Sequence, residues 1–338
     1  MNSSLPRLSL LGSLAVIVGV ALTLSSAQPT AGPLPAGHAA YATWPQIAAG
    51  QATIGAAHQR ETVTYWTDTR MATAVPRYGL RREMDGDGAV LPAPEASSQA
   101  PPRRQSQSAP EATSDGRRWN GGGKLTKTTG KVFFTMDGRD FTCSAAVVAS
   151  HNDDTVVTAG HCLKDGQGSW ARNWLFVPGY DDGERPYGSY AAREMLVAPQ
   201  WSEQGDDSYD FGVVVLDTDD GSHVADRTGA QRIAFNTANS ERVWAFGYPA
   251  TGRYAGRHLR YCAGPTTPDQ SGTHSSGMAC EMTQGSSGGP WLSDFDPQSG
   301  SGTVTSVISF KYANDTGTQY GPRLGDTARR LYQRAQRL

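Results

Sequence analysis

The sequence contains two adjacent serines in a glycine-rich turn, a histidine next to a cysteine, and an aspartate at the start of an apolar run. The serines, Ser286 and Ser287, lie in "GSSGGP", His161 lies in "TAGHC", and Asp210 lies in "YDFGVVVL". A serine hydroxyl is a weak nucleophile at neutral pH, so it needs a base to remove its proton and an acid to orient that base. These residue types predict covalent catalysis by a serine. The residue types alone do not show whether Ser286 or Ser287 is the nucleophile.

His161 and Asp210 each have an alternative, structural role. His161 follows a β-branched run and precedes Cys162, whose disulfide would fix its backbone. A histidine in such a place can also serve only in packing. Asp210 opens an apolar strand, where a half-buried carboxylate needs a partner, although it could instead cap the strand. Asp206 and Asp207 lie in a loop with Gly and Ser, so we expect them to be hydrated.

Short apolar runs between turn signals predict β-strands around these residues. The predicted strands fall within residues 131–149, 154–162, 209–217, 242–249 and 302–312. The first range contains a hairpin signal, Asp137-Gly138. The run from Val213 to Leu216 is continuously apolar, which is typical of a strand buried on both faces. Helical periodicity is weak before the C-terminus, so a β-barrel or sandwich is favoured over βαβ units.

One convincing helix is predicted at the C-terminus. Asp326 is placed to cap it. Its apolar face is predicted to hold Ala328, Leu331, Tyr332, Ala335 and Leu338. The arginines of this segment are expected on a solvated face rather than on nucleic acid.

The composition limits the class of protein. The 338 residues carry 30 basic and 32 acidic side chains, for a formal net charge of −2. This near-balance gives no reason to expect nucleic acid or an anionic membrane as a partner. The 39 Gly and 20 Pro favour a loop-rich or all-β chain.

Residues 1–27 are predicted to be a secretory signal peptide. Arg7 supplies a positive start, an apolar run follows from Leu8 to Leu24, and the small residues ending at Ala27 suit a signal peptidase. The alternative is an uncleaved anchor, for which the run is slightly short. We therefore expect a secreted, extracellular protein with no stable membrane association after cleavage.

Residues 28–118 are predicted to be a poorly ordered propeptide. Residues 28–84 show no clear core, and residues 85–118 form a linker rich in Pro and Ser that is expected to be disordered. Two dibasic pairs, Arg103-Arg104 and Arg117-Arg118, favour a cleavable leader over a permanent spacer. The dense domain is expected to cover residues 119–338.

The four cysteines allow three disulfide connectivities. Because they fall into two sequence-local pairs, we predict Cys143–Cys162 and Cys262–Cys280. Zinc is the competing interpretation, but the chain lacks a C-x-x-C pair. Calcium at Asp181-Asp182 or at residues 217–221 is less favoured than surface turns. We expect no metal and no cofactor.

The motif "GSSGGP" resembles the nucleophile loop of chymotrypsin-like serine peptidases, with Ser287 in the nucleophile position. The backbone N–H groups of Gly285 and Ser287 would then form the oxyanion hole. "TAGHC" and "YDFGVVVL" match the family's base and acid, His161 and Asp210, and Cys143–Cys162 matches the bridge that braces the histidine loop. The resemblance covers about Lys131 to Leu338.

This resemblance implies a fold and an activity. The fold is all-β, a double six-stranded β-barrel with a C-terminal helix. The activity is that of a secreted, monomeric serine endopeptidase that acts on proteins or peptides through an acyl-enzyme. The layout is similar to that of bacterial glutamyl endopeptidases. A catalytically silent binding protein on the same fold, or an esterase with the same triad, remains an alternative.

The stretch Gly285 to Gly289 also fits G-x-S-x-G, the nucleophile elbow of α/β-hydrolases. Those enzymes place their residues in the order Ser, acid, His. Here the order is His161, Asp210, Ser287, and no histidine follows Ser287. The sequence therefore favours the order of chymotrypsin-like peptidases.

Four residues are expected to shape the substrate pocket, and they point to different specificities. Glu281 precedes Ser287 by six residues, where trypsin-like members carry an aspartate, and would favour Arg or Lys before the scissile bond. Ser309 and Phe310 resemble a pocket wall, which puts Lys311 at the rim, where it would suit an acidic side chain. Alternatively, Glu281 and Lys311 are solvated or paired elsewhere.

The glutamyl endopeptidases also use a pocket histidine. This chain lacks it, since no histidine follows His274, so the sequence does not support their specificity. Ser286 stands where many relatives carry an aspartate that pairs with the new N-terminus after zymogen cleavage. A serine cannot form that ion pair, so activation is expected to proceed by removal of an inhibitory leader.

Overall fold

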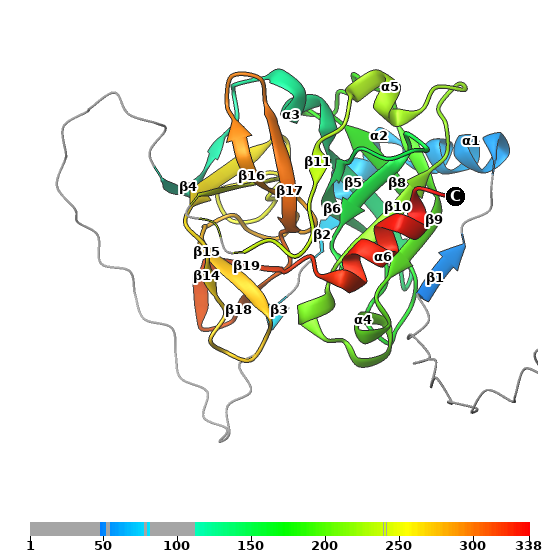
Figure 1. Cartoon of the computed structure of the whole chain (residues 1–338). Coiled ribbons are helices and arrows are strands. Elements are labelled where there is room, and N and C mark those ends of the chain that lie inside the picture. Colours follow the sequence, from blue (N-terminus) through cyan, green and yellow to red (C-terminus); the bar gives the residue numbers. More distant parts are fainter. Residues whose placement is uncertain (1–47, 52–54, 78–79, 82–111, 239, 241) are drawn as a thin grey trace, which may run out of the picture. The chain divides into compact units, whose positions relative to one another are not determined.

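The computed structural model describes residues 48–51, 55–77, 80–81, 112–238, 240 and 242–338. The predicted signal peptide, most of the predicted linker and the dibasic pair Arg103-Arg104 lie outside these residues. Within the described part, most of the regular structure is β-strand, arranged in two halves that are joined through the middle of the chain (Figure 1).

The first half is a closed six-stranded antiparallel barrel. Its strands follow the order β9-β10-β7-β6-β5-β8, and β8 pairs back to β9. Closure reduces the number of free strand edges. The strands are β5 (Thr129–Met136), β6 (Arg139–Val147), β7 (Thr155–Thr158), β8 (Arg172–Pro178), β9 (Tyr190–Val197) and β10 (Gly212–Leu216).

The expected strand pattern holds in this barrel. Every residue of β10 is buried, as its continuously apolar sequence predicts. The β5–β6 hairpin turns at Asp137 and Gly138, which both have positive φ, 49° and 75°. Two such residues form the turn that matches the twist of the flanking strands. The pairing of Met136 with Arg139 closes the hairpin.

The second half contains a six-stranded sheet and a five-stranded sheet. Its core includes Val243, Ala245, Met278, Trp291 and Ile308. The first sheet holds β11 (Arg232–Ile233), β17 (Ser301–Val307), β16 (Pro290–Asp296), β12 (Val243–Gly247), β13 (Arg260–Gly264) and β4 (Thr113–Arg118). The second holds β14 (Thr267–Pro268), β15 (Ser275–Ala279), β19 (Asp315–Pro322), β18 (Phe310–Tyr312) and β3 (Leu80–Arg81).

Short helices connect the strands, and a longer one follows them. The short ones are α3 (Gly123–Thr128), α4 (Pro199–Gln204), α5 (Val224–Thr228) and the 3-10 turns η1 (Gly160–Cys162) and η2 (Asp207–Tyr209). The C-terminal helix α6 (Asp326–Ala335) lies across β9 and β10 (Figure 1). None of the described helices is both long and apolar enough to cross a bilayer.

The prediction for the C-terminal helix is right in position and wrong in two details. Gly325, not Asp326, occupies the N-cap position, and Asp326 is the first helical residue. Its carboxylate accepts a hydrogen bond from Asn236 Nδ2 at 2.8 Å. The predicted face is buried at Ala328, Leu331 and Ala335 and half-buried at Tyr332. Leu338, however, is exposed because it lies beyond the end of the helix.

The predicted leader contains secondary structure that its sequence pattern does not indicate. The strand β1 (Ala48–Gln51) and the helices α1 (Ala56–Tyr65) and α2 (Asp68–Thr73) lie on the first barrel, followed by β2 (Val75–Pro76). No apolar stripe marks α1, whose buried side chains are polar, Gln59 and Thr62. These residues are buried only because the barrel covers them.

The structure also differs from the expectation at the end of the predicted linker. Residues Thr113–Arg118 form β4, which pairs antiparallel with β13. The main-chain carbonyl of Ser114 accepts a hydrogen bond from the Glu281 N–H at 2.6 Å. The dense domain therefore includes residues before Trp119. The polar sequence "TSDGRR" gives no strand signal because the ladder to β13 holds it through backbone groups.

Candidate active site

His161 and Asp210 form a buried pair on the first barrel. Nδ1 of His161 lies 2.7 Å from Oδ2 of Asp210, and the main-chain N–H of His161 donates to Oδ1 at 2.7 Å. An ionised carboxylate only accepts hydrogen bonds, so Nδ1 carries the proton. In the neutral ring this leaves Nε2 as the basic nitrogen. Nε2 is buried and has no hydrogen-bond partner among the described residues.

Asp210 remains ionised despite complete burial. Burial alone would raise the pKa of this carboxyl, but the charge of His161 and hydrogen bonds from His161 and Ser309 outweigh it. The pKa of Asp210 therefore lies below its usual value. A carboxylate held in this way orients the imidazole and stabilises it when it becomes positively charged.

The local sequence explains how His161 meets Asp210. The histidine follows β7 and lies in the tight turn η1. A Cβ atom on Gly160 would lie 2.9 Å from Asp210 Oδ1, so only glycine lets the carboxylate approach. Cys162 is bonded to Cys143 on β6, which fixes the turn from the other side. The second predicted disulfide, Cys262–Cys280, is also present.

Ser287 lies in a loop that packs against this turn. Its main-chain carbonyl accepts a hydrogen bond from Ser144 N at 2.7 Å, and Cys162 Sγ lies 3.8 Å from the same oxygen. Gly288 has a φ of +82°, and a Cβ atom there would lie 2.0 Å from Thr158 Oγ1. The glycine therefore lets the loop approach the end of β7. The three predicted residues, far apart in sequence, are brought together around the Cys143–Cys162 bridge.

The backbone of Gly285 is also fixed. Its φ is +94°, and a Cβ atom would lie 2.7 Å from the Tyr248 carbonyl oxygen. The Gly285 carbonyl accepts from Ser144 Oγ at 2.9 Å, and Ser144 Oγ accepts from Tyr248 N at 3.0 Å. This network holds the peptide group in one orientation. Sequence reasoning did not find Ser144, since a hydroxyl inside a strand carries no signal of its own.

Ser286 differs from its neighbour. Its hydroxyl donates to the Thr283 carbonyl at 2.7 Å, and its N–H donates to the same oxygen at 3.3 Å. The side chain is almost completely buried. The hydroxyl is therefore used inside the loop, where it stabilises the turn that presents Gly285.

Ser309 and Phe310 line the same small pocket as Ser287, and Ser309 has an additional contact. Its hydroxyl donates to Oδ2 of Asp210, the oxygen that faces His161. Phe310 stacks on Tyr320 with ring centroids 5.2 Å apart. The sequence indicated only a pocket wall for Ser309. Its contact with Asp210 could not be predicted, because the two residues belong to different halves of the domain and are far apart in sequence.

A small pocket of about 20 Å³ opens next to Ser287, room for about one water molecule. Lys311 lines it and is buried. Its ammonium group donates to the carbonyls of Cys280 at 2.5 Å and Thr316 at 2.6 Å. Burial lowers the pKa of Lys311 to about 8. The negative charges of Asp315 and Glu281 act in the other direction and raise this pKa, but their effect is smaller.

Of the two roles weighed for Glu281, the structure shows the one away from the pocket floor. The Glu281 side chain is half-exposed, and its carboxylate pairs with Arg253 Nη2 at 2.7 Å. Glu281 does not line the pocket beside Ser287. The hydrogen bond from its main chain to Ser114 of β4 directs this part of the chain to the surface.

The described residues offer poor ligands for a metal ion. One group of three donors, Cys143, His161 and Cys162, lies close together, but both sulfurs belong to the disulfide. Asp181 lies 2.5 Å from His258 Nδ1, and Asp182 faces Arg257 at 3.5 Å. These two carboxylates, weighed above for calcium, thus have positively charged or hydrogen-bonding partners from the chain itself.

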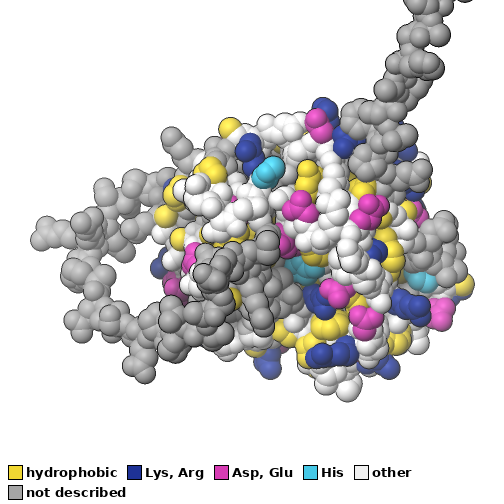
Figure 2. Space-filling view, turned by 90° about the horizontal axis from the view of Figure 1, so that it is seen from below, with side chains coloured by type: hydrophobic (Ala, Val, Ile, Leu, Met, Phe, Trp, Pro, Cys, Tyr) yellow, Lys and Arg dark blue, Asp and Glu magenta, His cyan; other side chains and the backbone are white. Residues whose placement is uncertain are grey.

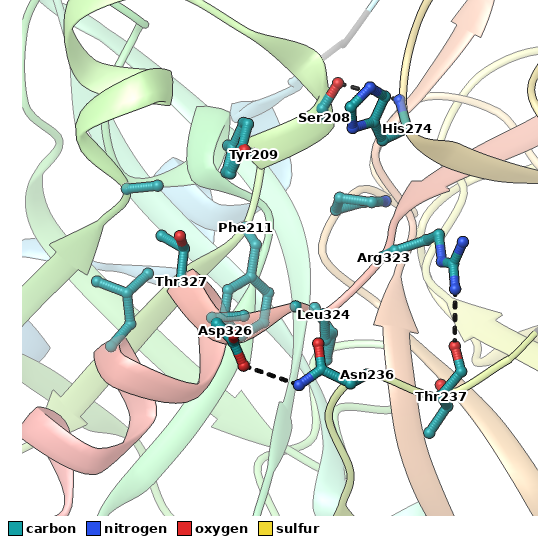
Figure 3. Close-up of a pocket in the computed structure, with 15 residues that line it drawn as sticks. Ser208, Tyr209, Phe211, Asn236, Thr237, His274, Arg323, Leu324, Asp326 and Thr327 are labelled. Atoms are coloured by element: carbon teal, nitrogen blue, oxygen red, sulfur yellow. Dashed lines mark hydrogen bonds between the residues drawn. The ribbon is translucent and has the colours of Figure 1, made fainter.

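A larger pocket of about 370 Å³ lies between the segment around Phe211, the segment around Asn236 and the start of α6 (Figure 3). Phe211 and Ser208 line it, together with the start of α6. Ser208 Oγ accepts from His274 N at 3.1 Å. None of His161, Asp210 and Ser287 lines this pocket, so it is separate from the candidate active site. On the face in Figure 2, Lys and Arg side chains are interspersed with Asp and Glu.

Comparison with known proteins agrees with this geometry. The family model described as Trypsin matches residues 120–323. A thermostable serine protease from an extremophilic microorganism is 40% identical; the match covers 63% of this chain and 99% of that one, with a TM-score of 0.60. Protease Anisep from Arthrobacter nicotinovorans is 37% identical, with coverages of 63% and 96% and a TM-score of 0.60.

Two further matches are more limited. A Glu endopeptidase has the same fold at 21% identity, with coverages of 66% and 98% and a TM-score of 0.54. A curated extracellular metalloprotease of Bacillus subtilis (strain 168) is 36% identical over 73 residues, 22% of this chain. The matched region spans 23% of that relative's length.

The barrel fold, the buried His–Asp pair beside a glycine-rich serine loop, and these matches define a serine endopeptidase of the chymotrypsin fold. The chain belongs to the trypsin family, and its substrates are proteins or peptides.

Proposed function

We propose that the chain is a secreted endopeptidase that hydrolyses peptide bonds through an acyl-enzyme on Ser287. The observation that carries the proposal is the His161–Asp210 pair, whose unpartnered Nε2 lies in the turn against which the Ser287 loop packs. Ser286 is the weaker candidate because its hydroxyl already donates to Thr283.

In the proposed mechanism, Ser287 Oγ attacks the substrate carbonyl carbon while His161 Nε2 takes the hydroxyl proton. Asp210 holds the ring in the tautomer that makes this transfer possible. The carbonyl oxygen becomes negatively charged and is stabilised by the N–H groups of Gly285 and Ser287, each worth about 3 kcal/mol. His161 then protonates the leaving amine, and water releases the acyl group by the reverse steps.

The pocket beside Ser287 supports a preference for an acidic residue before the scissile bond. Two of the three N–H donors of Lys311 bond to carbonyl groups in the described part of the chain, and the third is available to a carboxylate. A cationic substrate side chain would be repelled. Glu281, which could have attracted one, is paired with Arg253 at the surface.

Export and processing complete the proposal. The N-terminal signal and the two disulfides suit an oxidising compartment. The leader, residues 28 to about 112, is removed after export to give the active form. Ser286 has its partner inside the loop, so the active conformation does not need an ion pair with a new N-terminus.

Labelling with a fluorescent fluorophosphonate tests this proposal. The processed form should react at a single site, and peptide mapping should find the label on Ser287. A folded sample that does not react would favour a catalytically silent binding protein. Reaction with cleavage of esters but of no peptide in a diverse library would favour an esterase.

A further inference from the structure

The leader contacts the candidate active site directly, at Arg77. The Gly285 N–H, which would stabilise the substrate oxyanion, donates to the Arg77 carbonyl oxygen at 3.4 Å. The Arg77 N–H donates to the Thr142 carbonyl at 2.9 Å. The Arg77 guanidinium pairs with Asp165, a few residues after His161. A leader residue thus lies where a substrate carbonyl would bind.

The chain continues across both halves of the domain at this point. Val75 and Pro76 of β2 pair in parallel with Phe141 and Thr142 of β6. Beyond Arg77, β3 pairs in parallel with β18, where Leu80 lies opposite Lys311. The described parts of the leader therefore contact the first barrel at β6, the serine loop at Gly285 and the second half at β18.

This direction is opposite to that of a substrate in the proposed mechanism. The residue before the scissile bond enters the pocket lined by Lys311 of β18, and the amine leaves toward His161, which protonates it. A substrate accordingly runs from β18 toward β6. From its N-terminal to its C-terminal side, the leader instead pairs first with β6, through β2, and then with β18, through β3. Attack at Arg77 would release the amine on the pocket side, away from Nε2 of His161.

A second contact region anchors the leader far from the catalytic residues. Trp66 is almost completely buried, packs with Phe133, Leu175 and Val177, and donates from its indole N–H to the Asn173 carbonyl at 2.6 Å. This is the kind of aromatic anchor that dominates the energy of an interface.

Gln59 provides a polar anchor next to it. Its side-chain amide donates to the Ser189 carbonyl at 2.6 Å and accepts from the Ala191 N–H at 2.7 Å. Both atoms belong to the backbone at the start of β9, and Gln59 is buried. In addition, β1 extends the sheet by pairing antiparallel with β9. The anchored segment is therefore held by side-chain and main-chain contacts together.

We propose that residues 48–51 and 55–77 of the leader form a two-point inhibitor of this chain's own active site. Gln59 and Trp66 anchor the leader on the first barrel. At Arg77 the leader crosses the catalytic residues in the direction opposite to that of a substrate, so it blocks the site without being cut. The inference rests on the proposed function, because it assumes that Ser287 and Gly285 act on the substrate carbonyl.

The test compares the rate of fluorophosphonate labelling of the full-length precursor with that of its processed form. The two forms are present in one sample and are separated on a gel. We expect the wild-type precursor to label at least about 100-fold more slowly. Trp66→Ala and Gln59→Ala should each speed precursor labelling by about 30-fold or more, the effect of losing an interface anchor. The matched control is Arg60→Ala, an exposed residue of the same helix, and it should change nothing.

Labelling of the processed form serves as an internal control for folding. Every variant yields the same processed sequence, so wild-type labelling of that form shows that the variant folded. If Trp66→Ala fails to fold, Arg77→Ala, which removes the guanidinium contact with Asp165 but keeps the main-chain hydrogen bonds of residue 77, should still speed precursor labelling. A wild-type precursor that labels as fast as its processed form overturns the inference. A processed form that never labels refutes the proposed function instead.

The backward direction has its own measurement. Processed enzyme is incubated with the Ser287→Ala precursor, and the fragments are mapped by mass spectrometry. We expect no cut within residues 75–81 while sites elsewhere in the leader are cut. A cut after Arg77 would show that the segment binds as a substrate.

Discussion

Ser309 and His161 share one oxygen of Asp210. The Ser309 hydroxyl and Nδ1 of His161 both face Oδ2, so the carboxylate that orients the base is itself oriented from the second half of the domain. This contact couples the two halves at the proposed catalytic residues. It also helps to hold the pKa of Asp210 below its usual value.

Ser309→Ala should therefore reduce both catalysis and stability. A hydrogen bond to a charged group is worth about 1.5–3 kcal/mol, so kcat should fall about tenfold or more. Ser293→Ala, whose hydroxyl contacts Thr305 instead, is the matched control and should retain activity. An unchanged kcat in Ser309→Ala would show that this hydroxyl has no role in catalysis.

The same variant has a defined pH dependence of stability. Because the folded-state pKa of Asp210 is lowered, its contribution is present above its unfolded pKa of about 3.9 and is lost as pH falls through the folded-state pKa. Ser309→Ala weakens that contribution. The variant should thus be less stable to urea than wild type at pH 6, and the difference should shrink as pH falls below about 4. A constant difference would indicate lost packing only.

Lys311 should set the substrate preference. Lys311→Met is expected to abolish a preference for Asp or Glu before the scissile bond, while Lys127→Met, on α3, should not. Burial lowers the pKa of Lys311 to about 8, so the positive charge is lost as pH rises through that value. The wild-type preference should accordingly weaken between pH 7 and 9. Profiling with a peptide library at both pH values measures it, and a preference for Arg would contradict the assignment.

The two disulfides allow a matched comparison. Replacing both cysteines of either bridge should cost about 3 kcal/mol of stability, since the closed loops are of similar length, with separations of 19 and 18 residues. Only Cys143–Cys162 holds the His161 turn. Its removal should therefore lower kcat far more than removal of Cys262–Cys280, measured where both variants are folded. Equal losses of kcat would contradict the bracing role.

The mature N-terminus should fall between Arg81 and Thr113. Residues Thr113–Arg118 form β4 and are held by β13 and Glu281, so the dibasic pair Arg117-Arg118 is a poor site for proteolysis. N-terminal sequencing tests this directly, and a start after Arg118 would contradict it. Because Ser286 is bonded within its loop, a few extra N-terminal residues should leave activity intact.

The sequence was informative where a residue's neighbours in the chain decide its role. The glycines around His161 and Ser287 are required by close backbone approaches, and the hairpin at Asp137-Gly138 needs positive φ at both positions. Such local requirements leave a recognisable pattern. The continuous apolar run of β10 is likewise local and marks a doubly buried strand.

Roles that depend on distant partners could not be predicted in this way. Gln59 is a polar residue on a polar helix, and only the edge of β9 explains its burial. The backbone pairing of β4 has no side-chain pattern. Glu281 has the expected spacing from Ser287, but its hydrogen bond to Ser114 turns it away from the pocket. Each case is decided by tertiary contacts between segments far apart in sequence.

The most direct test of the account compares the two adjacent serines. Peptidase activity of processed Ser287→Ala and Ser286→Ala is measured alongside wild type, with folding checked by urea unfolding. We predict that Ser287→Ala has no detectable activity, because His161 then has no hydroxyl to activate, while Ser286→Ala retains most of it. An active Ser287→Ala enzyme, or a Ser286→Ala variant that is folded and inactive, would contradict the proposed mechanism.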